Sequence, residues 1–304
     1  MQFFKKIGTI AVIGLSFAAC SSGDGGDDLP ERDLGLFFGS TDPQQARNGV
    51  DYADATTELS DLEGQTFTVR VVRVTEDEET GEVRQETTDE IVNFQDEENL
   101  TITLDVATLN IVDGEAPADD GDVFTLRRRE GSSVQGFVLE KRDPDAITIN
   151  IGTSSFLIGA ETNPDQIDAL TGSVTYTAPL QINPVVGNRN SLRGDVTLEA
   201  NFASSTVSGD VTLAQVGTGV EVGLDLAPAA ITGNGFAGDL TIGTCSEASC
   251  TSDSEIGGVF FGNNGAEIGG LINLDVTISD ADGTTTDLIG TDAFVATEEV
   301  LCCE

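Results

Sequence analysis

The chain contains no histidine and no tryptophan, and its single methionine is Met1. Without histidine, no Ser-His-Asp or Cys-His constellation can form, and His-ligated zinc, copper and haem sites are excluded. Paired carboxylates remain as an enzymatic alternative, but no pair lies in an identifiable apolar pocket that would raise the pKa of one of them. We therefore expect a protein that is not an enzyme and that has no cofactor and no metal.

Basic residues are also scarce. The sequence has 14 Lys and Arg against 53 Asp and Glu, a formal net charge of −39. Such a charge repels nucleic acid and anionic membrane surfaces, so neither is an expected partner. Two interpretations of the charge stay open. It maintains solubility, for instance in a salty habitat, or its field attracts cationic ligands or a basic partner surface.

The N-terminus has the layout of an export signal. Lys5 and Lys6 precede an apolar run over residues 7–17, and two alanines come directly before Cys20. This resembles the lipobox of bacterial lipoproteins, which implies a signal peptide over 1–19 and lipidation of Cys20, with palmitate among the acyl chains. An ordinary secretory signal that contains a cysteine is the alternative. Residues 20–34, small and acidic at their start, are expected to form a flexible tether.

The region 35–165 is predicted to be a β-rich domain. Residues 66–75 alternate apolar and polar side chains, as a half-buried strand does. A hairpin turn is expected at Glu79 to Glu82 and a loop at 114–121. The other expected strands in this region are 101–112, 122–129, 134–141 and 146–157.

A second β domain is predicted over 170–300. Residues 160–171 contain Pro164 and interrupt the strand pattern with a short helical turn. The eight strands expected after it are 172–182, 193–203, 206–216, 219–226, 235–243, 255–262, 268–279 and 286–296. Eight short strands joined by Gly, Asn and Asp turns are typical of an up-and-down antiparallel barrel, whose interior side chains can fill. Binding would then fall to the loops and the outer surface.

The segment 258–270 carries an aromatic pair, a turn, one acid and five glycines. The residues of this predicted signature are Gly258, Phe260, Phe261, Gly262, Glu267, Gly269 and Gly270. The segment resembles the barrel signature of the transferrin-binding protein B family, and the order of the preceding strands supports the resemblance over about 130 residues. From the residues alone, we interpret the glycines as devices that let the barrel close.

This resemblance implies an all-β chain in which a smaller β-rich handle precedes an eight-stranded antiparallel barrel. Members of the family are lipoproteins of the Gram-negative outer membrane, often exposed on the cell surface. The resemblance therefore implies a lipid-anchored protein, facing the exterior or the periplasm, that captures a protein or an iron carrier. The alternative is a structural surface lipoprotein or adhesin without a small-molecule ligand.

Four cysteines remain beyond Cys20. Cys245 and Cys250 lie between two expected strands, and export makes a disulfide between them plausible. Cys302 and Cys303 directly precede Glu304, the last residue of the sequence. Four cysteines allow three pairings, among which the sequence does not choose, and a metal site made by all four is the functional alternative.

Two further motifs have both a structural and a functional interpretation. Asp280, Asp282, Gly283 and Asp287 partly match a calcium loop, but Asp-Gly is also a strong hairpin signal, and we favour the hairpin. The run 127–129 is three consecutive arginines. It is interpreted either as a contact for a partner or, as we favour, as an ion-paired surface whose individual pairs contribute little.

Overall fold

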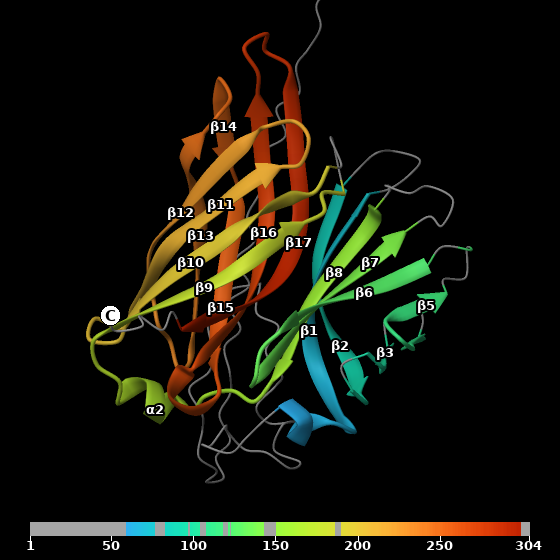
Figure 1. Cartoon of the computed structure of the whole chain (residues 1–304), viewed down its shortest axis with the longest axis vertical. Coiled ribbons are helices and arrows are strands. Elements are labelled where there is room, and N and C mark those ends of the chain that lie inside the picture. The colour runs from blue at the N-terminus through green and yellow to red at the C-terminus, as the bar shows by residue number, and fades with distance from the viewer. Residues whose placement is uncertain are drawn as a thin grey trace, which may run out of the picture. The chain divides into compact units, whose positions relative to one another are not determined.

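The structure, a computed structural model, describes residues 59–76, 83–96, 98–103, 108–117, 121, 123–142, 150–185 and 190–298. These residues all belong to one compact unit, Arg32–Glu304. They form two antiparallel sheets, one of eight strands and one of nine, shown in Figure 1. The expected signal peptide, the tether and the turn at Glu79 to Glu82 lie outside the described residues, as do Cys20, Cys302 and Cys303.

The first sheet, here called the handle sheet, has the order β4-β3-β2-β1-β8-β7-β6-β5. A short 3-10 helix, η1 (Leu59–Leu62), precedes it. Its strands are β1 (Gln65–Glu76), β2 (Val83–Phe94), β3 (Leu100–Thr103), β4 (Thr108–Ile111), β5 (Glu115–Pro117), β6 (Val123–Glu130), β7 (Val134–Arg142) and β8 (Asn150–Gly159). One face is an apolar core in which Phe137 stacks on Phe156 and meets the edge of Phe94. Because successive side chains of a strand point to opposite faces, every second residue of β7 and β8 faces this core and the others face the opposite side of the sheet.

The second sheet closes into an eight-stranded antiparallel barrel. The strands follow in the order β9 to β13, β15, β16 and β17, and β17 pairs with both β16 and β9. Their bounds are β9 (Ser173–Ile182), β10 (Leu192–Asn201), β11 (Thr206–Gln215), β12 (Glu221–Ala230), β13 (Gly235–Cys245), β15 (Ser254–Phe261), β16 (Glu267–Ser279) and β17 (Thr285–Glu298). The ninth strand, β14 (Ser249–Ser252), pairs with the far end of β16. The 3-10 turn η2 (Asn263–Gly265) joins β15 to β16.

Apolar side chains from every barrel strand fill the barrel interior. They form one cluster of buried residues that includes Leu198, Val211, Leu224, Ile272 and Phe294. Tyr176 lies among them and donates from its hydroxyl to the carbonyl of Gly265 at 2.7 Å. Burial raises the pKa of this tyrosine above its ordinary range, so the hydroxyl keeps its proton and its hydrogen bond.

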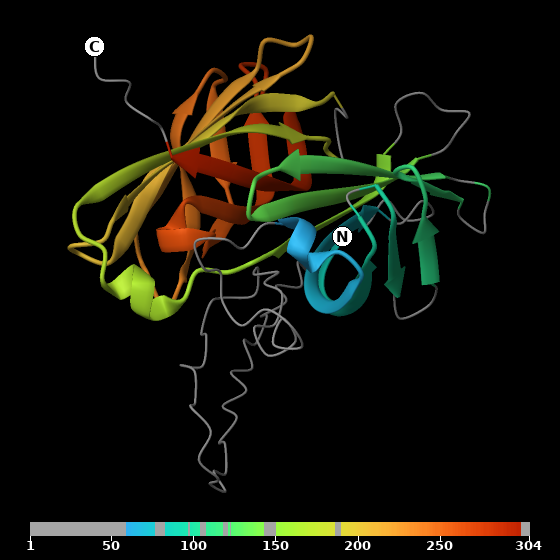
Figure 2. The same cartoon turned by 60° about the horizontal axis from the view of Figure 1, so that its bottom comes forward.

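A short helix, α2 (Pro164–Asp168), leads into the barrel, and Figure 2 shows this yellow-green helix near one end of the barrel strands. Asn163 caps it, because its side-chain oxygen accepts from the amide of Asp165 at 2.9 Å. Pro164 occupies the first turn, where its missing N–H costs nothing. Ile167 then packs into the barrel core.

The all-β class, the eight-stranded barrel and the β-rich sheet before it are confirmed. Two expectations about individual elements were wrong, and one strand was missed. The predicted strand 101–112 is two strands, β3 and β4, which pair with each other. The predicted loop 114–121 contains β5, and β14 was not predicted. In each case the element is three or four residues long, too short for an alternating pattern to be distinguished from a loop.

Within the part of the chain that the structure describes, no helix has both the length and the apolar character required to cross a membrane.

Candidate functional site

Three residues of the predicted signature face the barrel interior. Phe260 packs against the rings of Tyr176 and Phe202, at centroid distances of 6.0 and 5.5 Å. Gly258 makes room for neighbouring side chains, since a Cβ there would lie 2.7 Å from Ile268 Cγ2. A Cβ at Gly270 would overlap the ring of Phe294. These positions serve the packing of the barrel.

The other four signature residues face the handle sheet. Phe261 belongs to a buried cluster with handle residues such as Val134 and Leu157. A Cβ at Gly269 would lie 2.9 Å from Val134 Cγ2, and one at Gly262 would lie 2.6 Å from Ser133 Oγ. The structure therefore gives these two glycines a role different from the barrel closure that we expected. They permit the handle to approach the barrel closely.

Glu267, the acid of the signature, binds the turn between β6 and β7. One carboxylate oxygen accepts from the amide and the hydroxyl of Ser132 at 2.7 and 2.9 Å, and the other accepts from the amide of Ser133 at 2.8 Å. Only 5% of Glu267 is exposed. A buried carboxylate is stable only when such donors satisfy it, so the signature acid fixes the handle to the barrel.

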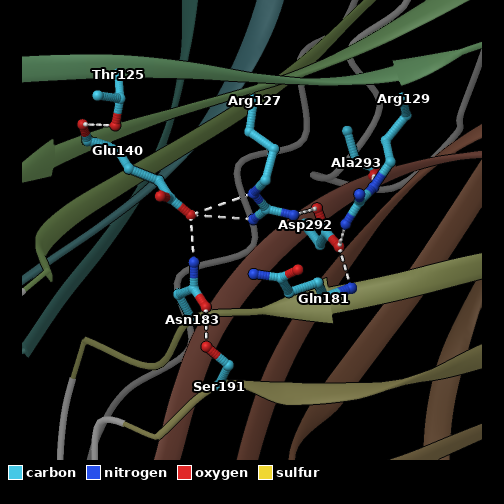
Figure 3. A network of polar contacts seen from close by, with 9 residues as sticks. All are labelled: Thr125, Arg127, Arg129, Glu140, Gln181, Asn183, Ser191, Asp292 and Ala293. Carbon is cyan, nitrogen blue, oxygen red and sulfur yellow. Dashed lines mark hydrogen bonds and ion pairs between the residues drawn. The ribbon is translucent and has the colours of Figure 1, made fainter. Parts of the chain in front are cut away.

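The three consecutive arginines are ion-paired, but their pairs differ in kind. Arg128 faces Glu98 at 3.2 Å in an exposed pair. Arg127 and Arg129 both reach Asp292 of barrel strand β17, at 3.3 and 2.7 Å, and Figure 3 shows the two guanidiniums on either side of its carboxylate. Asp292 is completely buried. The expectation of an ion-paired surface therefore fits Arg128, whereas Arg127 and Arg129 share a buried carboxylate.

The same network continues on the handle side of Asp292. Arg127 also pairs with Glu140 at 3.1 Å, and Glu140 accepts from the side-chain amide of Asn183 (Figure 3). Asn183 in turn accepts from the hydroxyl of Ser191 at 2.7 Å. Burial raises the pKa of Asp292, and the two arginines and the backbone amide of Gln181 oppose this rise.

The outer surface of the barrel carries an unbalanced acidic face. From residue 143 to the end of the sequence, Arg189 and Arg193 are the only basic residues. Cross-strand register places Asp210 directly opposite Asp225, and Asp239 opposite Glu255. The residues of this acidic face are Asp210, Asp225, Asp239, Asp253, Glu255, Asp275 and Asp287. Like charges directly opposite each other destabilise a sheet, so this face costs the fold stability.

Two members of the acidic face have raised pKa values. Partial burial and then the charges of Asp239 and Asp253 raise the pKa of Glu255 above its ordinary 4.5. Partial burial and then the charges of Asp253 and Asp287 raise the pKa of Asp275 above its ordinary 3.8. Asp253 is common to both. The native state thus binds protons at these two sites more tightly than the unfolded chain does, and their ionisation reduces stability as the pH rises.

An Asp253→Asn variant is expected to melt at a higher temperature than the wild type at pH 7, because it removes the charge that repels both carboxylates. The difference should shrink as the pH falls toward the ordinary carboxyl range, where Glu255 and Asp275 become protonated. Thermal melts between pH 7 and 5 measure it. Asp282→Asn, an equal charge change in an exposed turn, is the control, and an identical pH dependence in the two variants would contradict the prediction.

Cys245 and Cys250 form a disulfide that joins the end of β13 to β14. The two residues are five apart in the sequence, so the bridge closes a short hairpin. It lies at the end of the barrel where β14 pairs with the last residues of β16. The disulfide therefore holds a local hairpin and does not cross-link distant parts of the chain.

Replacing both cysteines with serine is expected to lower the free energy of unfolding by about 2 kcal/mol, the loop-entropy value for so short a loop. The barrel should persist, because its strands pair without the bridge. Denaturant titration of the variant beside the oxidised wild type measures the loss. Reduced wild type should match the variant, and a loss several times larger would show that the bridge supports the barrel itself.

Residues 280–287 form a hairpin turn, the interpretation that we favoured over a calcium loop. One carboxylate oxygen of Asp280 accepts from the amides of Asp282 and Thr284, both at 2.9 Å. Asp287 instead accepts from the hydroxyl of Thr277 across the hairpin. No group of three or more His, Cys, Asp or Glu residues among those described is arranged to hold a metal ion.

One open groove lies over β10 to β13, with a volume of about 320 Å³. Gly194 and Gly223 lie along it, and the exposed Arg193 and Glu221 also line it. Both charged side chains of the groove are solvent-exposed. We assign it no ligand.

A model of the C-lobe and N-lobe β-barrels of transferrin-binding protein B matches residues 163–294, which include α2 and the barrel strands up to most of β17. Residues 163–294 form a β-barrel domain of the transferrin-binding protein B type. No curated protein matches the chain. Among solved structures, transferrin-binding protein B from Haemophilus parasuis Hp5 is similar, with 16% identity over 77% of this chain and a TM-score of 0.43. Isotype 1 transferrin-binding protein B from serogroup B Neisseria meningitidis has 16% identity over 77% and a TM-score of 0.41.

The chain spans 45% and 44% of the length of these two structures. Within its transferrin-binding protein B-type barrel, the signature residues were recognised from the sequence. The contacts of Asp292 and Glu140 were not predicted from the sequence. The only signal for them was the run of three arginines in an otherwise acidic chain, and the sequence did not indicate which acids those arginines meet.

Proposed function

We propose that this chain is a lipid-anchored outer-membrane protein, tethered through Cys20, that captures a protein or iron-carrying ligand. One observation carries the proposal, the transferrin-binding protein B-type barrel over 163–294. Proteins of that family are named for binding transferrin, and they are binding proteins rather than enzymes. The lipobox-like residues before Cys20 support the anchor and the location.

The ligand is proposed to bind on the barrel's outer face and loops. The barrel interior is filled by the apolar cluster, which favours binding on the outside. The half of the chain that forms the acidic face contains almost no basic residues that could neutralise it. A positively charged protein surface is the complementary partner, and electrostatic attraction of this kind speeds association at low salt.

The anchor is tested by following labelled palmitate into the wild type and Cys20→Ala, together with protease treatment of intact cells. We expect label in the wild type alone and cleavage from outside the cell. Absence of label in the wild type would refute the anchor. Label combined with protection from protease would instead favour a protein that faces the periplasm.

Ligand capture is tested with purified chain, iron-loaded transferrin as the first probe, and growth of a deletion strain under iron limitation. Capture predicts a saturable complex that weakens with salt, and a growth defect when iron is scarce. The alternative is a structural surface lipoprotein or adhesin, which the unbalanced acidic face also fits. It predicts altered attachment or envelope integrity, with normal growth under iron limitation.

A further inference from the structure

The ladder between β9 and β17 is interrupted where the barrel closes. Thr297 pairs with Thr177, and Glu298 pairs with Tyr176. Farther along, the amide of Val185 donates to the carbonyl of Ile289 at 2.9 Å, in the same antiparallel register. That register places Ala293 opposite Gln181, and Val295 opposite Pro179. Proline has no N–H to donate, so the ladder cannot be continuous here.

The handle supplies the missing contacts. The carbonyl of Ala293 accepts from Arg129 Nε at 3.2 Å, although Gln181 is its partner in the register. The amide of Gln181 donates instead to a carboxylate oxygen of Asp292, at 2.9 Å. That same oxygen is 2.7 Å from Arg129 Nη2. An arginine from β6 and an aspartate side chain thus replace a backbone hydrogen bond between two barrel strands.

Each group in this arrangement depends on the others. Asp292 is completely buried, so its charge requires positive partners, and both partners come from the handle. A Cβ at Gly136 would lie 3.2 Å from the Cβ of Ala293. The glycine therefore allows β7 to approach β17 closely. Arg129 is paired across the handle sheet with Gly136. The close approach and the buried charge therefore occur at the same point.

The network also reaches the loop between β9 and β10. Asn183 follows β9, Ser191 precedes β10, and both are joined through Glu140 to Arg127. The carbonyl of Ser191 then accepts from the amide of Val216, in the loop between β11 and β12, at 2.9 Å. A change in the handle arginines can therefore be transmitted to two loops at one end of the barrel.

We infer that Arg127, Arg129 and Asp292 form a clasp through which the handle closes the β9–β17 seam of the barrel and positions the β9–β10 loop. The β9–β17 ladder pairs at Thr297 and Glu298, and between there and Val185 the handle side chains complete it. A partner that displaces the handle releases the β9 edge and the loop stem together. The clasp is thus a conformational device that couples the handle to one end of the barrel.

The test is amide hydrogen exchange on the full chain, comparing Arg129→Ala with Arg128→Ala. Both variants remove one arginine from the same strand, but Arg128 pairs with the exposed Glu98 and not with Asp292. We expect the Gln181 amide to exchange at least about tenfold faster in Arg129→Ala and at the wild-type rate in Arg128→Ala. Arg127→Ala should accelerate exchange at Val216.

A second variant keeps the test decisive if Arg129→Ala does not fold. Arg129→Lys retains the positive charge but lacks the guanidinium fork that contacts Asp292 and the Ala293 carbonyl at once. It should fold and should show faster exchange at Gln181 than the wild type. Wild-type exchange at Gln181 in whichever Arg129 variants fold would overturn the clasp.

Discussion

An Asp292→Ala variant is expected to lose about 3 kcal/mol of its free energy of unfolding, the lower part of the range for breaking a buried ion pair. The change leaves Arg127 and Arg129 without their shared carboxylate and Gln181 without its acceptor. The side chains of Arg127 and Arg129 are 19% and 16% exposed, so water compensates their charges in part. Urea denaturation followed by circular dichroism measures the loss.

Asp287→Ala is the matched control for this prediction. It removes an acid from the same strand, but Asp287 is exposed and accepts from the hydroxyl of Thr277 at the surface. A change within about 0.5 kcal/mol is expected there. Asp292→Asn should lie between the two, because an amide oxygen still accepts from Gln181. Equal stability of Asp292→Ala and Asp287→Ala would show that the buried carboxylate does not hold the two sheets together.

A Glu267→Ala variant is expected to lose about 2 kcal/mol and to free the turn between β6 and β7. The change removes the acceptor of the Ser132 and Ser133 amides, and a buried amide without a partner costs about 1–3 kcal/mol. Ser133 is buried, whereas Ser132 is exposed and regains water. Denaturation measures the stability, and trypsin cleavage beside Arg129 reports the opening of the turn.

Glu255→Ala provides a control of opposite sign. Glu255 lies on β15, beside the strand that carries Glu267, but acids surround it and its charge is repelled. Its removal should leave stability unchanged or raise it, with no gain in trypsin cleavage. Glu267→Gln keeps one oxygen acceptor and should lose less than the alanine variant. Rapid cleavage in both alanine variants would indicate general loosening and would contradict a specific role for Glu267.

The barrel strands were predictable because their side chains alternate between a filled interior and a polar exterior. In β10, the buried Val196, Leu198 and Ala200 alternate with less buried residues. The glycine-rich signature was also predictable as a motif, because the order of its residue types is contained in one short stretch of the sequence. The sequence did not predict which signature residues face the barrel interior and which face the handle. Neighbouring residues such as Phe260 and Phe261 point to opposite faces, and only the packed structure shows what lies beyond the outer one.

By itself, the sequence determined the all-β class, the eight-stranded barrel, the absence of histidine chemistry and the acidic excess. Each of these follows from composition or from a period of two along a strand, and neither depends on which distant residues meet in the fold. Tertiary structure alone decided that Glu267 binds Ser132 and Ser133, and that Arg127 and Arg129 share Asp292. Those partners lie more than 130 residues apart, and a charge that must be buried accepts whichever opposite charge the fold brings to it.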